Sequence, residues 1–252
     1  IAGPTYEQQM IIALRDLAAK GGKNVVLMYS DNEYGRGPVN VVRDSGIIDK
    51  LGLKLVDLVE YRYDAQDVTA QMLRIKAKNP DLVYVQGSTP QLIVALRDAA
   101  KAGLPTKLFM GNMYNISPAI PEQLGPAAEG FRAIQTYAFF GDNIPAMKEI
   151  EEYAKKNEVE KKDIYFIKGW LKGKVIAAAI ENAIKKAGGK VPADIKAFRK
   201  SVRDEMEALK DFDTGGITPP FTYKDHQGSV QARVAEIKDG KYTPVGTWIN
   251  AR

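Results

Sequence analysis

The sequence contains no cysteine and a single histidine, His226. These absences exclude disulfides, thiolate nucleophiles and cysteine-ligated zinc, and they exclude metal sites built from several histidines. No run of apolar residues approaches the roughly 18 that a membrane-spanning helix requires. The net charge of +5 comes from lysines and arginines spread along the chain, which indicates a solvated surface rather than a nucleic-acid-binding face.

The length and the apolar content suit a protein with a packed core. At 252 residues, 45% of them hydrophobic, the chain is long enough for one large domain or two small ones. It begins with Ile1 rather than methionine, and no signal peptide is visible at its start. We therefore expect an N-terminus that has been processed or cut.

The first half of the sequence alternates between apolar runs and helical patterns. Apolar runs at 25–29, 53–59, 82–85 and 108–110 are typical of strands buried in a parallel sheet. Between them lie helical patterns, including one at 38–50, and a capping-box pattern at Thr5 and Gln8 starts an earlier helix. Strands that alternate with helices at this spacing predict βαβ units and an α/β fold with a doubly wound parallel sheet.

The pattern changes after about residue 139. Helices are predicted at 145–157, 164–186 and 193–203, and extended segments at 221–223, 232–237 and 242–248. Asp239-Gly240 between the last two predicts a hairpin. We therefore expect residues 1–138 and 221–252 to form one α/β lobe and residues 139–220 to form a separate helical segment.

The sequence offers no catalytic constellation. It has neither the glycine-rich phosphate loop with lysine nor the dinucleotide fingerprint after a strand, so no cofactor is expected. Gly169 and Gly173 lie one helical turn apart, which favours close helix packing over a ligand role. Asp225 and His226 could form a base and its orienter, but no motif places a serine or cysteine nucleophile beside them. A hydrolase is therefore the weaker interpretation, and we expect neither catalytic nor metal-binding residues.

Polar and aromatic residues follow the predicted strands. Ligands of open α/β sheets bind beyond the carboxyl ends of the strands. Hydroxyls, an amide, a thioether and aromatic rings suit a small organic molecule held by a few polar contacts and apolar walls. The residues at these strand ends are Tyr34, Ser88, Thr89, Asn112, Met113 and Tyr114.

Several stretches resemble one known family. They are YSDNEYGRG at 29–37, PDLVYV at 80–85, FDTGGITPPF at 212–221 and DHQGS at 225–229. They resemble the type I periplasmic solute-binding proteins, the leucine/isoleucine/valine-binding-like components of ABC importers. The resemblance implies two α/β lobes that are joined by hinge strands and close on a ligand. It also implies secretion to the periplasm and delivery of the ligand to an ABC permease in the inner membrane.

The resemblance also implies roles for individual residues. Tyr34 would border the ligand cleft, Ser88 and Thr89 would offer hydroxyls, and residues 112–114 would form its floor. Trp170 would reach the ligand from the helix of the other lobe. An alternative from another class is a ligand-sensing regulatory domain of the same fold; an upstream signal peptide and a neighbouring permease gene would favour transport.

Two departures from the family pattern matter. Family members carry an N-terminal lobe ahead of the point where this chain begins, so residues 139–220 would complete that missing lobe. We expect the missing lobe or another chain to cover the helix at 164–186. Amino-acid binders of the family place an acidic side chain where this sequence has Met113. The expected ligand is therefore a branched-chain amino acid or a related carboxylate or amide, with a preference for ligands that lack an ammonium group.

Overall fold

The computed structural model describes residues 2–252, which divide into two compact units. The first, here called the sheet unit, comprises Thr5–Gln135 and Ala232–Arg252, and the second, the helical unit, comprises residues 2–4 and Thr136–Gln231. The sequence division instead placed residues 221–231 with the sheet. They belong with the helical unit because Phe221 pairs with Phe212 in an isolated antiparallel bridge, with their ring centroids 5.7 Å apart.

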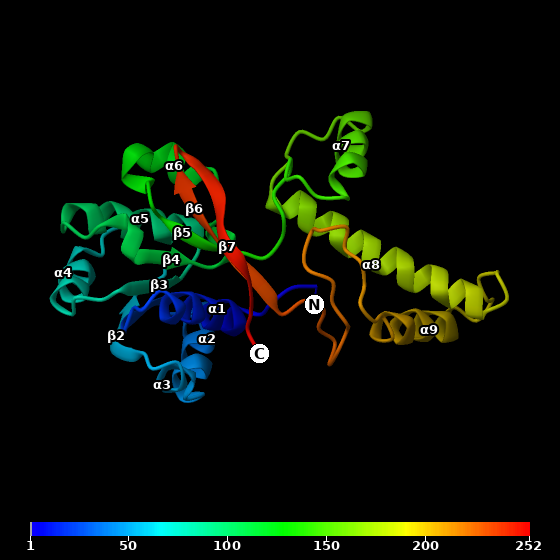
Figure 1. Ribbon diagram of the computed structural model, residues 1–252, viewed down its shortest axis with the longest axis horizontal. Helices are drawn as coiled ribbons and strands as arrows, with labels where there is room; N and C mark the ends of the chain where they lie inside the picture. The colour runs from blue at the N-terminus through cyan, green and yellow to red at the C-terminus, as the bar shows by residue number, and fades with distance from the viewer. Residues whose placement is uncertain (1) are drawn as a thin grey trace. The chain divides into compact units, whose positions relative to one another are not determined.

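The sheet unit follows the predicted alternation of strands and helices (Figure 1). Its elements in chain order are α1 (Tyr6–Ala19), β1 (Asn24–Ser30), α2 (Glu33–Asp44), α3 (Ile47–Lys50), β2 (Lys54–Tyr61), α4 (Thr69–Ala77), β3 (Leu82–Gln86), α5 (Thr89–Lys101), η1 (Thr106–Leu108), β4 (Phe109–Gly111), η2 (Met113–Asn115), α6 (Ala119–Leu124), η3 (Gly125–Ala128), β5 (Arg132–Gln135), β6 (Gln231–Lys238) and β7 (Lys241–Asn250).

The seven-stranded sheet has the order β2-β1-β3-β4-β5-β6-β7. The strands from β2 to β5 run parallel, and β6 pairs antiparallel with β5. The predicted α/β fold with a doubly wound parallel sheet is confirmed. So is the hairpin, because β6 and β7 are neighbours joined across Asp239-Gly240. The chain passes from β1 outward to β2 and then returns to β3, which creates a topological switch point between β1 and β3.

Helices pack on both faces of this sheet. Figure 1 shows α1, α2 and α3, here called the lower layer, on one side of the strands and α4, α5 and α6 on the other side, to the left and top. The lower layer shares one apolar core with the strands, and each fully buried side chain of this kind contributes about 1.5–3 kcal/mol. Members of this core include Met10, Leu14, Leu17, Val25, Leu27, Val39, Val42, Leu82, Tyr84, Met110 and Ile134.

Two departures from the predictions concern extended segments. The strand β5 was not predicted, because a four-residue run that starts with Arg132 has too few apolar residues to signal a strand. The segment 221–223 was predicted as extended, but the structure forms no strand there beyond the isolated bridge at Phe221.

The helical unit contains α7 (Met147–Lys156), α8 (Ile164–Lys186) and α9 (Ile195–Glu207). The bounds of α8 agree with the prediction. Asp163 caps it, since its carboxylate accepts hydrogen bonds from the backbone N–H groups of Tyr165 and Phe166 at 2.9 and 3.1 Å. Within the described residues no helix is both long enough and apolar enough to span a membrane.

The Thr-Gly-Gly motif at 214–216 is a structural loop of the helical unit. Gly215 and Gly216 have φ angles of 66° and 86°, which favour glycine. A Cβ atom on Gly215 would lie 2.6 Å from the Cβ of Ala146. The Thr214 hydroxyl donates to the carbonyl of Thr218 and accepts from the backbone N–H of Thr218 at 3.1 Å. The motif therefore shapes this loop.

Candidate functional site

The switch point places two loops side by side at the carboxyl edge of the sheet. β1 and β3 pair directly, with Tyr29 opposite Gln86 at their ends. The segments that follow them begin α2 and α5, and the segment after β4 begins η2. Crevices at such a position are where open α/β sheets bind ligands. Six of the residues predicted as ligand contacts therefore lie at this one edge of the sheet unit.

Tyr34 lies in the first turn of α2, not in a loop as the sequence analysis placed it. The predicted helix began at Pro38, whereas α2 begins at Glu33. Asn32 caps it, because its side-chain oxygen accepts a hydrogen bond of 3.0 Å from the backbone N–H of Gly35. Gly35 permits the close approach of this turn to β1, since a Cβ atom there would lie 2.0 Å from the Ser30 carbonyl oxygen.

Pro38 leaves a backbone group of this turn without its helical partner. Proline has no N–H, so the carbonyl of Tyr34, four residues earlier, loses its helical hydrogen bond. The side-chain amide of Gln86 donates to that carbonyl at 3.1 Å instead. Gln86 is fully buried at the end of β3. The first turn of α2 is therefore fixed to the end of the neighbouring strand.

Asn112 joins the three loops of the edge. Its Nδ2 donates to the Tyr34 hydroxyl at 2.9 Å and to the Gly87 carbonyl at 3.1 Å. Its Oδ1 accepts from the backbone N–H of Tyr114 at 2.9 Å. The side chain is fully buried, so its amide is engaged with protein groups and organises the edge.

Met113 is also buried, and its backbone N–H donates to the side chain of Gln9 in α1 at 2.9 Å. Ser88 and Thr89 start α5. The backbone N–H of Ser88 donates to Gln91 Oε1 at 2.7 Å, as in a capping box. The Thr89 hydroxyl donates to the Tyr114 carbonyl at 2.8 Å. These contacts hold the loops after β3 and β4 together.

Tyr6, which was not predicted as a site residue, lies at the same edge. Its ring contacts that of Tyr34 edge to face, with 5.0 Å between centroids, and it contacts the Tyr114 ring at 6.1 Å. We call Tyr6, Tyr34 and Tyr114 the tyrosine cluster. All three side chains are half-buried. A signal was present in the sequence, because Tyr6 directly follows the helix cap Thr5 and α1 starts at the carboxyl edge.

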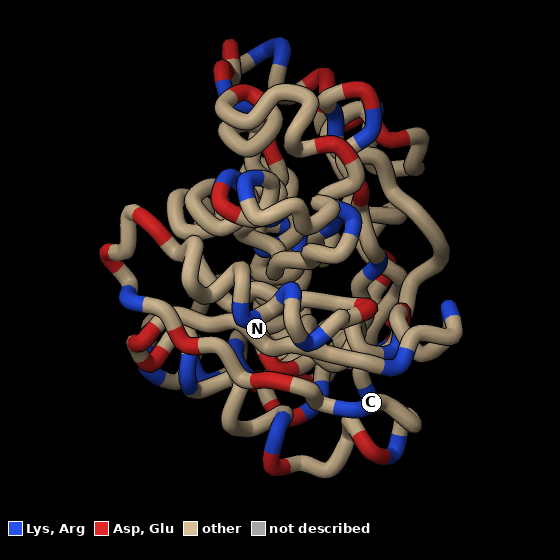
Figure 2. The backbone as a smooth tube through the Cα atoms, turned by 90° about the vertical axis from the view of Figure 1, so that its left-hand side faces the viewer, with Lys and Arg blue, Asp and Glu red and all other residues tan. Residues whose placement is uncertain are grey.

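Charged groups contribute little to this edge. The Asp31 carboxylate accepts from the backbone N–H of Tyr63 at 2.8 Å, and Glu33 is exposed on α2. Burial raises the pKa of Tyr34 well above its usual range, so its hydroxyl stays neutral. Among the described residues, no cluster of His, Cys, Asp and Glu is suited to a metal ion. Figure 2 shows lysine and arginine interspersed with aspartate and glutamate along the chain.

Trp170 lies in the helical unit, in a groove of about 840 Å³ along α8. Its ring contacts Tyr153 at 5.2 Å and Phe166 at 6.5 Å. Gly169 and Gly173 also line this groove, and a Cβ atom on either would meet no atom within 4 Å. The two glycines therefore do not serve close packing within the described chain. A role for Trp170 beside the other predicted site residues stays a prediction.

The α/β fold and the carboxyl edge of its sheet are typical of a ligand-binding protein. The buried polar groups at this edge position its loops. Residues 1–241 match a family model described as periplasmic binding protein. The chain belongs to the type I periplasmic binding proteins, the family of ABC-transporter substrate-binding components. This family is non-enzymatic, as predicted, and its location is extracytoplasmic.

Named relatives support this assignment. Over 217 residues the chain is 25% identical to the leucine-, isoleucine-, valine-, threonine- and alanine-binding protein of Pseudomonas aeruginosa, covering 86% of this chain and 56% of that protein. A structure from the Pseudomonas fluorescens group, described as an ABC transporter permease, superimposes with a TM-score of 0.85 at 22% identity, covering 99% of this chain and 63% of that one.

A further similar structure is a branched-chain amino acid ABC transporter protein from Thermus thermophilus with bound valine. It superimposes with a TM-score of 0.79 at 23% identity, covering 98% of this chain and 65% of that one. The chain thus spans between half and two thirds of the length of these relatives, and the ligand, partners and activity of the whole protein are matters for proposal.

Proposed function

We propose that this chain is the larger part of a periplasmic solute-binding protein that delivers a small organic ligand to an ABC permease in the inner membrane. The carboxyl edge of the sheet carries the proposal. Its loops are fixed before any ligand arrives, through Asn112, Gln86 and Thr89. Such preorganisation reduces the entropy lost on binding.

The proposed ligand lacks an ammonium group. An unpaired ammonium in a closed cleft costs several kcal/mol. At the position where amino-acid binders of the family carry an acid, this chain has the buried Met113, and its neighbour Asn112 is neutral and already hydrogen-bonded. A carboxylate or amide with an apolar or aromatic body suits this edge better, although a branched-chain amino acid remains the alternative if another lobe supplies the counter-charge.

We also propose that a further α/β lobe covers α8. The relatives are longer than this chain. The groove along α8 exposes aromatic rings, and Tyr153 and Tyr165 are 47% and 46% exposed. Glycine inside a helix costs up to about 1 kcal/mol relative to alanine, so two such glycines with open space around them indicate that another surface approaches the helix there.

Calorimetry on the full-length gene product tests the ligand class. Leucine, valine and their deaminated acids, 4-methylpentanoate and 3-methylbutanoate, are titrated under identical conditions. The proposal predicts that the deaminated acids bind more tightly than the amino acids. Tight binding of leucine without binding of 4-methylpentanoate would overturn the preferred ligand class and leave an amino-acid carrier.

A further inference from the structure

Two side-chain hydroxyls of the carboxyl edge form hydrogen bonds within the protein. The Tyr34 hydroxyl accepts from the buried Asn112 and donates to the buried Gly87 carbonyl at 3.4 Å. Because both partners are buried, the hydroxyl end of Tyr34 points inward and the accessible part of this side chain is its ring. The Thr89 hydroxyl is likewise used within the edge, on the Tyr114 carbonyl. The hydroxyls of Tyr34 and Thr89 are therefore already bonded to protein groups.

The tyrosine cluster gathers rings from three separate elements at this edge. Tyr6 comes from α1, Tyr34 from α2 and Tyr114 from η2. The Tyr6 and Tyr34 rings meet at an interplanar angle of 89°, and those of Tyr6 and Tyr114 at 50°. Hydrogen bonds fix the backbone beside these rings. Tyr6 follows a capping box in which the backbone N–H of Thr5 donates to Gln8 at 3.0 Å, and Tyr114 is bonded through both of its backbone groups.

We infer that the tyrosine cluster receives an aromatic ring of the ligand and that Tyr6 is the residue that determines this specificity. The inference rests on the proposed binding function and narrows its ligand class to aromatic carboxylates or amides. Half-buried rings at an edge-to-face angle leave ring surface on which a further aromatic ring can pack in the offset or edge-to-face geometry that such pairs prefer. Tyr6 is central because it contacts both other rings.

A ligand cation is the competing occupant of an aromatic cluster. A desolvated cation also needs an acidic partner. The loop after β4 provides none, the Asp31 carboxylate is bonded to the backbone of Tyr63, and Glu33 is exposed to solvent on α2. The neutral ring is therefore the occupant that this edge favours.

The test compares 3-phenylpropionate with 3-cyclohexylpropionate, which share one carboxylate and one carbon skeleton and differ in aromaticity. Both probes are titrated into the full-length gene product by calorimetry, as wild type and as Tyr6→Leu, Tyr6→Phe and Tyr63→Leu. Tyr63 is 55% exposed on the segment after the edge strand β2 and is not part of the cluster. Thermal melting of each variant confirms that it folds.

We expect the wild type to bind the phenyl probe roughly tenfold more tightly than the cyclohexyl probe. Tyr6→Leu should abolish that preference, while Tyr6→Phe and Tyr63→Leu should retain it. Equal affinity of the wild type for both probes, or a preference that survives in Tyr6→Leu, would overturn the inference and leave the binding function standing.

Two further outcomes have defined meanings. Loss of the preference in Tyr6→Phe would show that the protein distinguishes the two probes through the Tyr6 hydroxyl rather than through its ring. That result also overturns the inference. If the wild type binds neither these probes nor any amino acid or deaminated acid of the preceding experiment, the proposed binding function fails, and the inference fails with it.

Discussion

At the residue scale, one buried amide decides the shape of the candidate site. Asn112 bonds to two segments that are distant in the sequence, at Tyr34 and Gly87, and to Tyr114 in its own segment. A buried donor or acceptor that loses its partner costs about 1–3 kcal/mol. The arrangement of the tyrosine cluster therefore depends on a residue that is itself buried away from any ligand.

Replacing Asn112 with alanine should lower both stability and ligand affinity. The N–H of Tyr114 would lose its side-chain acceptor and the Gly87 carbonyl would lose one of its donors, at a cost of about 1–3 kcal/mol. Urea denaturation measures this loss, with Asn157→Ala as the control, because Asn157 is an exposed asparagine at the end of α7. If Asn112→Ala were no less stable than Asn157→Ala, Asn112 would have no organising role.

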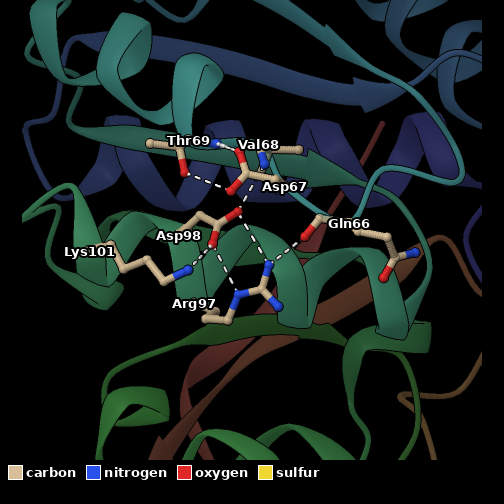
Figure 3. A network of polar contacts seen from close by, with 7 residues as sticks. All are labelled: Gln66, Asp67, Val68, Thr69, Arg97, Asp98 and Lys101. Carbon is tan, nitrogen blue, oxygen red and sulfur yellow. Dashed lines mark hydrogen bonds and ion pairs between the residues drawn. The ribbon is translucent and has the colours of Figure 1, made fainter.

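Asp98 is a second residue on which the stability of the sheet unit depends (Figure 3). Its buried carboxylate accepts from the backbone N–H of Val68 at 2.9 Å, from Arg97 at 3.0 Å and from Lys101 at 3.1 Å. Burial raises the pKa of this carboxyl and is the largest single effect, but the three hydrogen bonds together outweigh it and lower the pKa below its usual range. The interaction therefore fixes the segment before α4 to α5.

The lowered pKa of Asp98 gives a pH dependence with a definite sign. Its stabilisation is fully present above the unfolded-state pKa of about 4 and is lost as the pH falls through the lower folded-state pKa. Asp98→Asn should therefore destabilise the protein by about 2–3 kcal/mol at pH 7 and progressively less below pH 4.

Denaturation at several pH values checks this expectation. Asp204→Asn is the control, because Asp204 also pairs with Arg203 and Lys200 but its side chain is 46% exposed, where such pairs contribute little. A destabilisation by Asp98→Asn that stayed constant down to pH 2 would contradict the account.

At the element scale, the sequence predicted the elements that have a strong hydrophobic pattern. It did not predict those that depend on contacts formed only in the folded chain. The core strands β1 and β3 and the long helix α8 agree with their predictions. The start of α2 was missed because Gly35, Gly37 and Pro38 have poor helix propensity, and the compensating contacts from Asn32 and Gln86 exist only in the folded chain. Tyr6 was missed for a similar reason, since its ring partners come from distant segments.

The two glycines of α8 give a prediction for that helix. Gly169→Ala and Gly173→Ala should each stabilise a protein made of residues 1–252 by about 0.5–1 kcal/mol, because a Cβ atom there meets open space. In the full-length gene product the same changes should destabilise, because the covering lobe would approach these positions. Urea denaturation of both forms measures the difference.

Asn40→Ala in α2 is the control, since Asn40 is exposed and alanine has the higher helix propensity. It should stabilise both forms alike. If the α8 changes behaved as this control does in the full-length protein, no other surface would pack against α8 at these positions.

At the scale of the whole molecule, the sheet unit and the helical unit differ in how far their apolar side chains are covered. The sheet unit has helices on both faces of its sheet, as the alternating pattern predicted. In the helical unit, α8 carries a groove of about 840 Å³ lined by aromatic rings. The side chains of Tyr153 and Tyr165 at this groove are 47% and 46% exposed. The exact boundary between the units was not predicted, because the extended pattern at 221–223 gives no sign that Phe221 pairs with Phe212.

A protein produced as residues 1–252 alone should therefore self-associate. Light scattering should report species larger than a monomer, and a dye that binds exposed apolar surface should fluoresce. Both signals should fall when the sequence includes a further lobe of roughly 100–150 residues. A clean monomer without dye binding would contradict the proposed covering of α8.

The central claim is that this protein holds a small molecule and releases it unchanged. The most direct measurement is calorimetric titration of the full-length gene product, followed by mass spectrometry of the recovered ligand. The panel consists of amino acids, their deaminated acids and aromatic carboxylates. The account predicts saturable one-to-one binding of at least one of these compounds and recovery of that compound intact. Absence of binding across the panel, or recovery of a chemically altered compound, would contradict it.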